Sequence, residues 1–62
     1  MEKIVRMYRC ENEIITISLY GNGKYYIRYP VCTCGGFETL CDAINTLSWH
    51  RPKARLIAAN YN

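Results

Sequence analysis

Four cysteines are the residues of this 62-residue chain whose chemistry stands out. They are Cys10, Cys32, Cys34 and Cys41, and two of them form the motif Cys32-Thr33-Cys34. Zinc binds four thiolates in a tetrahedron, and structural zinc sites are closed in this way. A core this small rarely yields more than about 3–5 kcal/mol, so a metal that adds folding free energy would suit the chain. The cysteines therefore predict a structural Zn²⁺ held by all four thiolates.

Other interpretations of the cysteines stay open. They can be small buried or free thiols, and a disulfide ranks below both because thiols stay reduced in the cytosol. Cys34 precedes the expected helix, where a thiol pKa falls, but no general base stands near it in the sequence. His50 is excluded as a ligand because it lies at the far end of that helix, roughly 14 Å beyond Cys41 at 1.5 Å per residue.

The elements that must position these thiols follow from hydrophobic periodicity. Alternating patterns predict strands over residues 3–9, 14–20 and 24–29, and Asn22-Gly23 predicts a tight hairpin turn. Apolar residues at spacings of three and four predict a helix from Phe37 to Pro52. A last strand is expected over 54–61, although the two alanines after Ile57 would also suit a helix. The predicted fold is a single α+β domain of order βββαβ, with the helix on one face of an antiparallel sheet.

This topology explains why distant cysteines could meet. The first and third strands run parallel, so Cys10 and the pair Cys32 and Cys34 are expected at one edge of the sheet. The helix begins nearby, and Cys41 lies one turn inside it, on the apolar stripe. All four thiols are therefore expected at one end of the molecule.

The sheet face turned away from the helix is the expected partner surface. Tyrosine and arginine are enriched at interface hot spots and can also stack on single-stranded bases. Ordinary solvated cross-strand pairs would explain the same pattern. Thr16 and Ser18 are expected on this face together with the predicted partner-binding residues Arg6, Tyr8, Tyr20, Tyr26 and Arg28.

Composition and charge argue against several classes of function: obligatory nucleic-acid binding, membrane insertion and catalysis. The net charge of +3 is too small to require a nucleic-acid partner. No apolar run approaches the roughly 18 residues of a membrane span, and no signal peptide is evident, which predicts a cytoplasmic protein without a membrane partner. The single histidine and five acidic residues are not spaced as a catalytic group, and Glu38 with Asp42 fits a solvated helix face. The protein is expected not to be an enzyme.

Two families share part of the pattern. Residues 23–30, 36–40 and 42–44 resemble the strand, loop and helix of HicB-like antitoxins, which are βββαβ proteins. The same stretch looks like the sheet-to-helix junction of the three-stranded DNA-binding domains of phage integrases, where a Gly-Phe step such as Gly36-Phe37 opens the helix. Each likeness covers under half the chain and accounts for none of the cysteines. It implies this fold and, as the second functional choice, a nucleic-acid-binding module.

The whole chain resembles, in format, the small phage or prophage proteins that inhibit host defence nucleases. Anti-CRISPR inhibitors of the type II CRISPR nuclease are the leading example. This resemblance implies a zinc-stabilised protein that binds a host nuclease stoichiometrically in the cytoplasm of the host cell. The positive charge argues against DNA mimicry, which needs an acidic surface, and favours direct docking on the nuclease.

Overall fold

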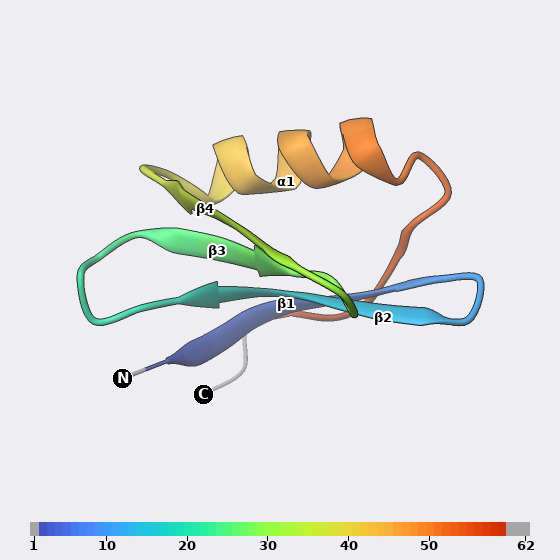
Figure 1. Cartoon of the computed structure of the whole chain (residues 1–62), viewed down its shortest axis with the longest axis horizontal. Coiled ribbons are helices and arrows are strands. Elements are labelled where there is room, and N and C mark those ends of the chain that lie inside the picture. Colours follow the sequence, from blue (N-terminus) through green and yellow to red (C-terminus); the bar gives the residue numbers. More distant parts are fainter. Residues whose placement is uncertain (1, 60–62) are drawn as a thin grey trace.

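Five strands and one helix make up the computed structural model of the chain, which describes residues 2–59 (Figure 1). Neighbouring strands are antiparallel throughout, in the order β4-β3-β2-β1-β5. The helix packs on one face, over β3 and β4. The predicted α+β class is confirmed, with one strand more than expected. The bounds are β1 Lys3–Cys10, β2 Glu13–Leu19, β3 Tyr25–Arg28, β4 Thr33–Phe37, α1 Leu40–His50 and β5 Arg55–Ala59.

The five residues 20–24 join β2 to β3. The Gly23 amide donates to the Tyr20 carbonyl at 3.0 Å, and the Tyr20 amide donates to the Lys24 carbonyl at 3.0 Å. Gly23 has φ of 81°, whereas Asn22 keeps a negative φ and accepts a hydrogen bond from the Lys24 amide through its side chain. The predicted hairpin is confirmed, with the left-handed residue of a bulged turn at Gly23.

Strand β4 is the element that the sequence pattern did not predict. It contains Gly35-Gly36, and glycine weakens a strand because it loses the most backbone entropy and has no side chain to pack. Here β4 pairs with β3, and Tyr26 lies opposite Gly35 in the ladder. Because Phe37 ends this strand, the helix begins three residues later than expected.

Helix α1 has a clear start and a sheet-facing stripe. The Thr39 side chain accepts a hydrogen bond from the Asp42 amide at 3.1 Å, which satisfies one of the free amides of the first turn. Ala43 and Leu47 are buried, and Leu40 and Ile44, at helical spacing from them, pack against the core. The chain leaves the helix at Arg51, before Pro52.

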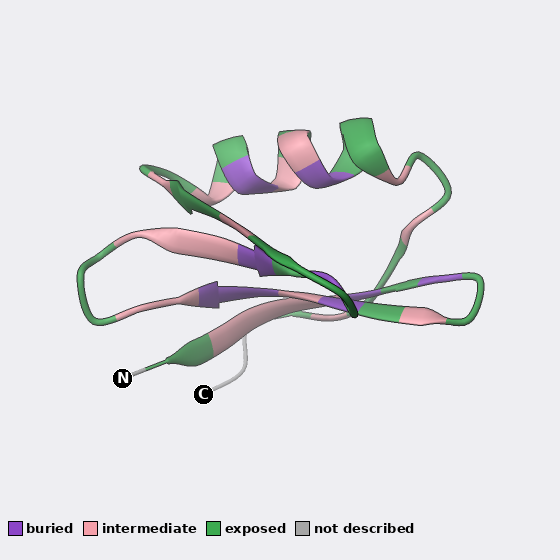
Figure 2. Ribbon diagram, viewed as in Figure 1, coloured by how far each residue is buried: buried purple, intermediate pink, exposed green. Residues whose placement is uncertain are grey.

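The core lies between α1 and the sheet. Figure 2 shows buried segments on the side of the helix that faces the strands, along β2 and towards the end of β3. Ile15, Ile17 and Ile27 have no exposed surface, and Leu47 closes the space from the helix. The core residues are Tyr8, Cys10, Ile15, Ile17, Ile27, Tyr29, Ala43 and Leu47.

The last strand, β5, pairs within the chain, against β1. It covers Arg55–Ala59, and the part of the expected strand at residues 60 and 61 lies outside the described residues. Within residues 2–59, no helix is long and apolar enough to cross a membrane.

Candidate binding face and the placement of the cysteines

Two tyrosines form a fixed pair on the sheet face opposite the helix. The ring centroids of Tyr20 and Tyr26 lie 4.5 Å apart with an interplanar angle of 56°. The Tyr26 hydroxyl accepts a hydrogen bond from the Asn22 side-chain amide at 3.1 Å. Both side chains are half-buried, so part of each remains accessible to solvent.

The Tyr26 ring lies on the two glycines of β4. A Cβ atom added to Gly35 would sit 2.5 Å from a carbon of this ring, and one added to Gly36 would sit 2.9 Å from it. No real Cβ approaches a neighbour so closely. The ring that covers the glycines therefore leaves no room for a side chain at either position. In turn, the ring shields their backbone from solvent.

Arg28 extends this face on the far side of Tyr26. Its guanidinium pairs with Glu2, with both N–O distances at 3.1 Å. The buried Ser18 hydroxyl donates to the same carboxylate at 2.7 Å. The Ser18 hydrogen bond, followed by that of Arg28, lowers the pKa of Glu2 below its ordinary value, and Glu2 in turn raises the pKa of Arg28. Below, "tyrosine face" means Tyr20, Tyr26, Arg28 and Glu2.

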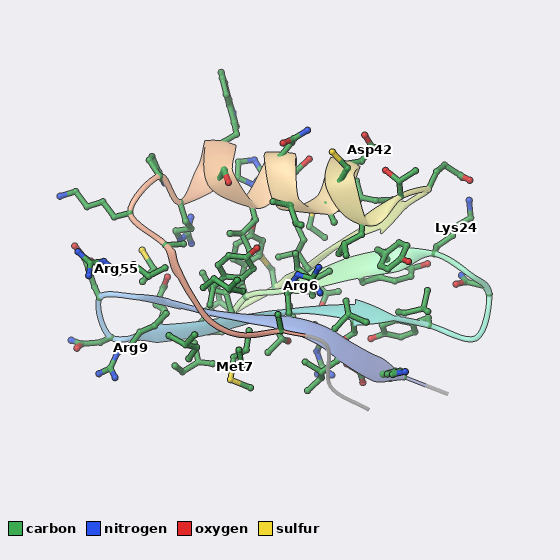
Figure 3. All side chains as sticks on the ribbon, turned by 180° about the vertical axis from the view of Figure 1, so that it is seen from behind. Arg6, Met7, Arg9, Lys24, Asp42 and Arg55 are labelled. Carbon is green, nitrogen blue, oxygen red and sulfur yellow. The ribbon has the colours of Figure 1, made fainter. Side chains whose placement is uncertain are left out.

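Two of the predicted partner-binding residues lie on the other side of the sheet. Tyr8 is 8% exposed and belongs to the core, where it stands opposite Ile15 in the ladder. Arg6 stands opposite Ile17, and Figure 3 shows its side chain between the sheet and the helix. The placement of both on the outer face was wrong. An irregularity between Ile4 and Arg6 shifts the alternation of β1, and a sequence pattern does not reveal such a bulge.

The four cysteines occupy different environments. Cys10 is buried at the end of β1, Cys34 is half-buried in β4 opposite Ile27, and Cys32 is exposed before β4. Cys41 was expected on the covered stripe of the helix, and this was wrong. It is exposed and accepts a hydrogen bond from the Asn45 side chain at 3.7 Å. The covered stripe runs through Leu40, Ala43, Ile44 and Leu47 at spacings of three and four, and Cys41 lies off it.

No metal-binding group is assembled in the described part of the chain. Nowhere in residues 2–59 do three cysteine, histidine or carboxylate side chains come together in a way that could hold a metal ion. Burial is the main cause that raises the pKa of Tyr29, and the nearby thiol groups of Cys34 and Cys32 raise this pKa further. These two cysteines therefore lie near the same tyrosine. Cys41 is the residue that fits a closed site least, since it faces solvent. The zinc site stays a prediction.

Tyr29 ties the end of the helix to the sheet. Its hydroxyl lies 3.1 Å from Nδ1 of His50, and the Arg51 guanidinium lies 5.0 Å from the centre of its ring. Arg51 also donates to Glu13 at 3.1 Å, which raises the pKa of Arg51. This cluster closes the core at the end of α1 and gives His50 a structural contact.

Three of the eight lysine and arginine side chains form ion pairs in the described part of the chain. Lys24 pairs with Glu38, which lowers the pKa of Glu38 and raises that of Lys24. With the pairs of Arg28 and Arg51, three cations of the described chain are compensated. Glu2 is the member of the tyrosine face that sequence reasoning missed, because its partner Arg28 lies 26 residues away.

Comparison with family models, curated proteins and solved structures found no match to this chain.

Proposed function

We propose that the protein is a binding module that docks a protein partner on the tyrosine face. One observation carries the proposal: two tyrosine rings are held in a fixed pair beside an arginine whose position is set by a carboxylate. Tyrosine and arginine are among the side chains that contribute most to protein interfaces. The face lies on the side of the sheet opposite α1.

The pair is ordered before any partner arrives. Tyr26 is packed on Gly35 and Gly36 and anchored by Asn22, and Tyr20 packs on Tyr26. A side chain that is already fixed loses little conformational entropy on binding, and tyrosine has only two rotatable side-chain bonds to begin with. A rigid aromatic pair of this kind supports a specific, tight contact.

The charge of the face favours protein over nucleic acid. Arg28 is the only cation of the tyrosine face, and Glu2 already neutralises it. Nucleic-acid binding draws most of its affinity from uncompensated cations that displace counterions from phosphates. A neutral aromatic surface is better matched to a protein partner.

The small size of the chain and its lack of an evident active site suggest which class of partner to test first. Its size and its resemblance to small phage inhibitors support a bacterial defence nuclease, with the type II CRISPR nuclease as the leading candidate. One copy would occupy one nuclease and block it by occupancy, so inhibition would be complete at a stoichiometric ratio. A structural zinc would stabilise the fold of the module and would take no direct part in inhibition.

The experiment mixes the purified full chain with purified type II CRISPR nuclease and measures complex formation and DNA cleavage. We expect a 1:1 complex that stops cleavage, and at least about tenfold weaker binding for Tyr20→Ala, as for an interface hot spot. Trp49→Ala removes an aromatic side chain that is 81% exposed on the helix and is the matched control, with unchanged binding.

The outcomes separate the functional classes. If the chain forms no complex with the nuclease, the choice of partner is overturned. A salt-sensitive shift of DNA or RNA by the chain alone, weakened by Tyr20→Ala, would favour the nucleic-acid-binding alternative. Equal weakening by Tyr20→Ala and Trp49→Ala would remove the tyrosine face from the interface.

A further inference from the structure

Strand β5 leaves one edge of the sheet open. It is the last strand in the order across the sheet and pairs on one side only, with β1. Within residues 2–59, no backbone group lies on its outer side as a partner. Unpaired amides and carbonyls along an edge strand are a template for another extended chain.

The middle of this edge is apolar and open to solvent. Leu56 is 52% exposed and Ile57 is 50% exposed, although both lie in the centre of the strand. The helix does not cover them, because it packs over β3 and β4 at the other side of the sheet (Figure 1). An added strand would bury part of both side chains, which gives strand addition an apolar contribution besides its hydrogen bonds.

The beginning of the edge carries an uncompensated positive charge. Arg55, the first residue of β5, stands opposite Arg9 in the ladder, and both are exposed. Figure 3 shows the two at the same end of the sheet. Like charges placed directly opposite each other destabilise a sheet. In the described part of the chain neither arginine has an ion-pair partner, and Arg9 donates only to the Glu11 carbonyl at 3.4 Å.

We propose that the β5 edge binds an extended acidic segment of another protein by strand addition. The incoming backbone pairs with residues 55–59, and its apolar side chains pack beside Leu56 and Ile57. Its carboxylates lie beside Arg55, and Arg9 adds positive charge from the next strand inward. An extended backbone, apolar side chains and carboxylates are all required, so a partner that lacks any of them is excluded. A second copy of this chain is a poor occupant, since it carries a net charge of +3 and brings its own arginines. This surface is separate from the tyrosine face.

The experiment titrates isotope-labelled full chain with a blocked octapeptide of alternating glutamate and valine, followed by NMR. We expect shift changes and slowed amide exchange concentrated in residues 55–59. Arg55→Glu should weaken binding by at least about tenfold, as reversal of a charge at an interface does. Lys3→Glu makes the same change at an exposed position at the start of β1 and should leave binding within about twofold.

Peptide variants test the mode of binding. N-methylation of alternate amides should abolish binding for the set that faces β5 and spare the other set, because only one edge of the peptide donates to the strand. The proposal is overturned if both methylated peptides bind equally, if a lysine-valine peptide binds as well, or if Arg55→Glu and Lys3→Glu have equal effects. Binding of a single-stranded oligonucleotide at Arg9 and Arg55, with no peptide binding, would overturn it as well. Tyr20→Ala should leave peptide affinity unchanged, so this test and that of the tyrosine face can fail separately.

Discussion

The Tyr26 ring lies so close to Gly36 that a Cβ atom there would come within 2.9 Å of its hydroxyl oxygen and of its outermost ring carbon. This contact joins an edge strand that is weak by composition to the aromatic pair of the tyrosine face. Fold and candidate function therefore depend on the same two residues. Changes at Gly36 should affect both.

Gly36→Ala is expected to destabilise the chain by about 1–3 kcal/mol, the usual cost of overpacking a filled site. Removing the ring with Tyr26→Ala should reduce that cost, so the two substitutions should be non-additive in urea unfolding. The Lys24 side chain also stands 2.9 Å from the added atom, which makes the rescue partial.

Gly23→Ala is the matched control for this experiment. Gly23 has free space around it and a φ of 81°, so its cost of about 1–2 kcal/mol comes from the left-handed backbone. That cost should be the same with and without the Tyr26 ring. Additive behaviour at Gly36, or coupling at Gly23, would contradict the contact described.

Core packing gives a second expected outcome. Leu47 is 1% exposed and is the largest fully buried side chain on the helix, so Leu47→Ala should cost about 2–5 kcal/mol. For a domain this small, that is enough to unfold much of the population at 37 °C. Leu56→Ala deletes the same atoms at a site that is 52% exposed and should cost much less. Circular dichroism during urea unfolding measures both, and equal costs would place Leu47 outside the core.

The elements that could be predicted are those set by local pattern. Alternation in 14–20 and the three-four spacing that places Leu40, Ile44 and Leu47 on one stripe identify β2 and α1, because burial on one face imposes a period. Strand β4 could not be predicted in this way. Its glycines disfavour a strand locally, and what makes them suitable is the close approach of residues 24–26, above all of the Tyr26 ring.

In the candidate site, too, the residues set by local alternation could be predicted and the others could not. Tyr20, Tyr26 and Arg28 follow from simple alternation and lie where expected. Arg6 and Tyr8 do not, because a bulge reverses the face of β1. The cysteines illustrate a further limit. Whether they come together depends both on the twist of the strands and on which helix face carries Cys41, and their spacing in the sequence reveals neither. The pairing of Glu2 with Arg28 is a contact between the two ends of a three-strand meander, and no short-range pattern encodes it.

The cap of the helix gives a third expected outcome. Thr39→Ala removes the acceptor of the Asp42 amide and should cost about 1 kcal/mol of unfolding free energy, whereas Thr39→Ser should keep most of it. Thr33→Ala, at an exposed position in β4, is the control for loss of a threonine. If Thr39→Ser is as unstable as Thr39→Ala, the hydroxyl does not act as the cap.

The zinc prediction has its own decisive measurement. If four thiolates hold the metal, native mass spectrometry should find one zinc per chain, and a chelator should remove it together with the folded structure. Cys41→Ser tests the closed site, because Cys41 is exposed on α1 and must turn inward to ligate. Unchanged zinc content in Cys41→Ser would exclude the tetrathiolate site. If the chain stays folded without metal, its stability comes from the apolar core.

The pH dependence of stability should follow Glu2 and Glu38, whose pKa values are both lowered in the folded chain. A folded pKa below the unfolded one means that the unfolded chain binds more protons as pH falls. Both groups therefore contribute stability at neutral pH, and this contribution is lost as pH falls from the ordinary carboxyl range through the folded pKa. Ser18→Ala removes the largest cause of the shift at Glu2 and should raise the midpoint of the Glu2 carboxyl in a carbon-detected NMR titration. Thr16→Ala removes a neighbouring hydroxyl of the same face and should leave that midpoint in place. A Glu2 midpoint that does not move in Ser18→Ala would contradict the hydrogen bond between the two residues.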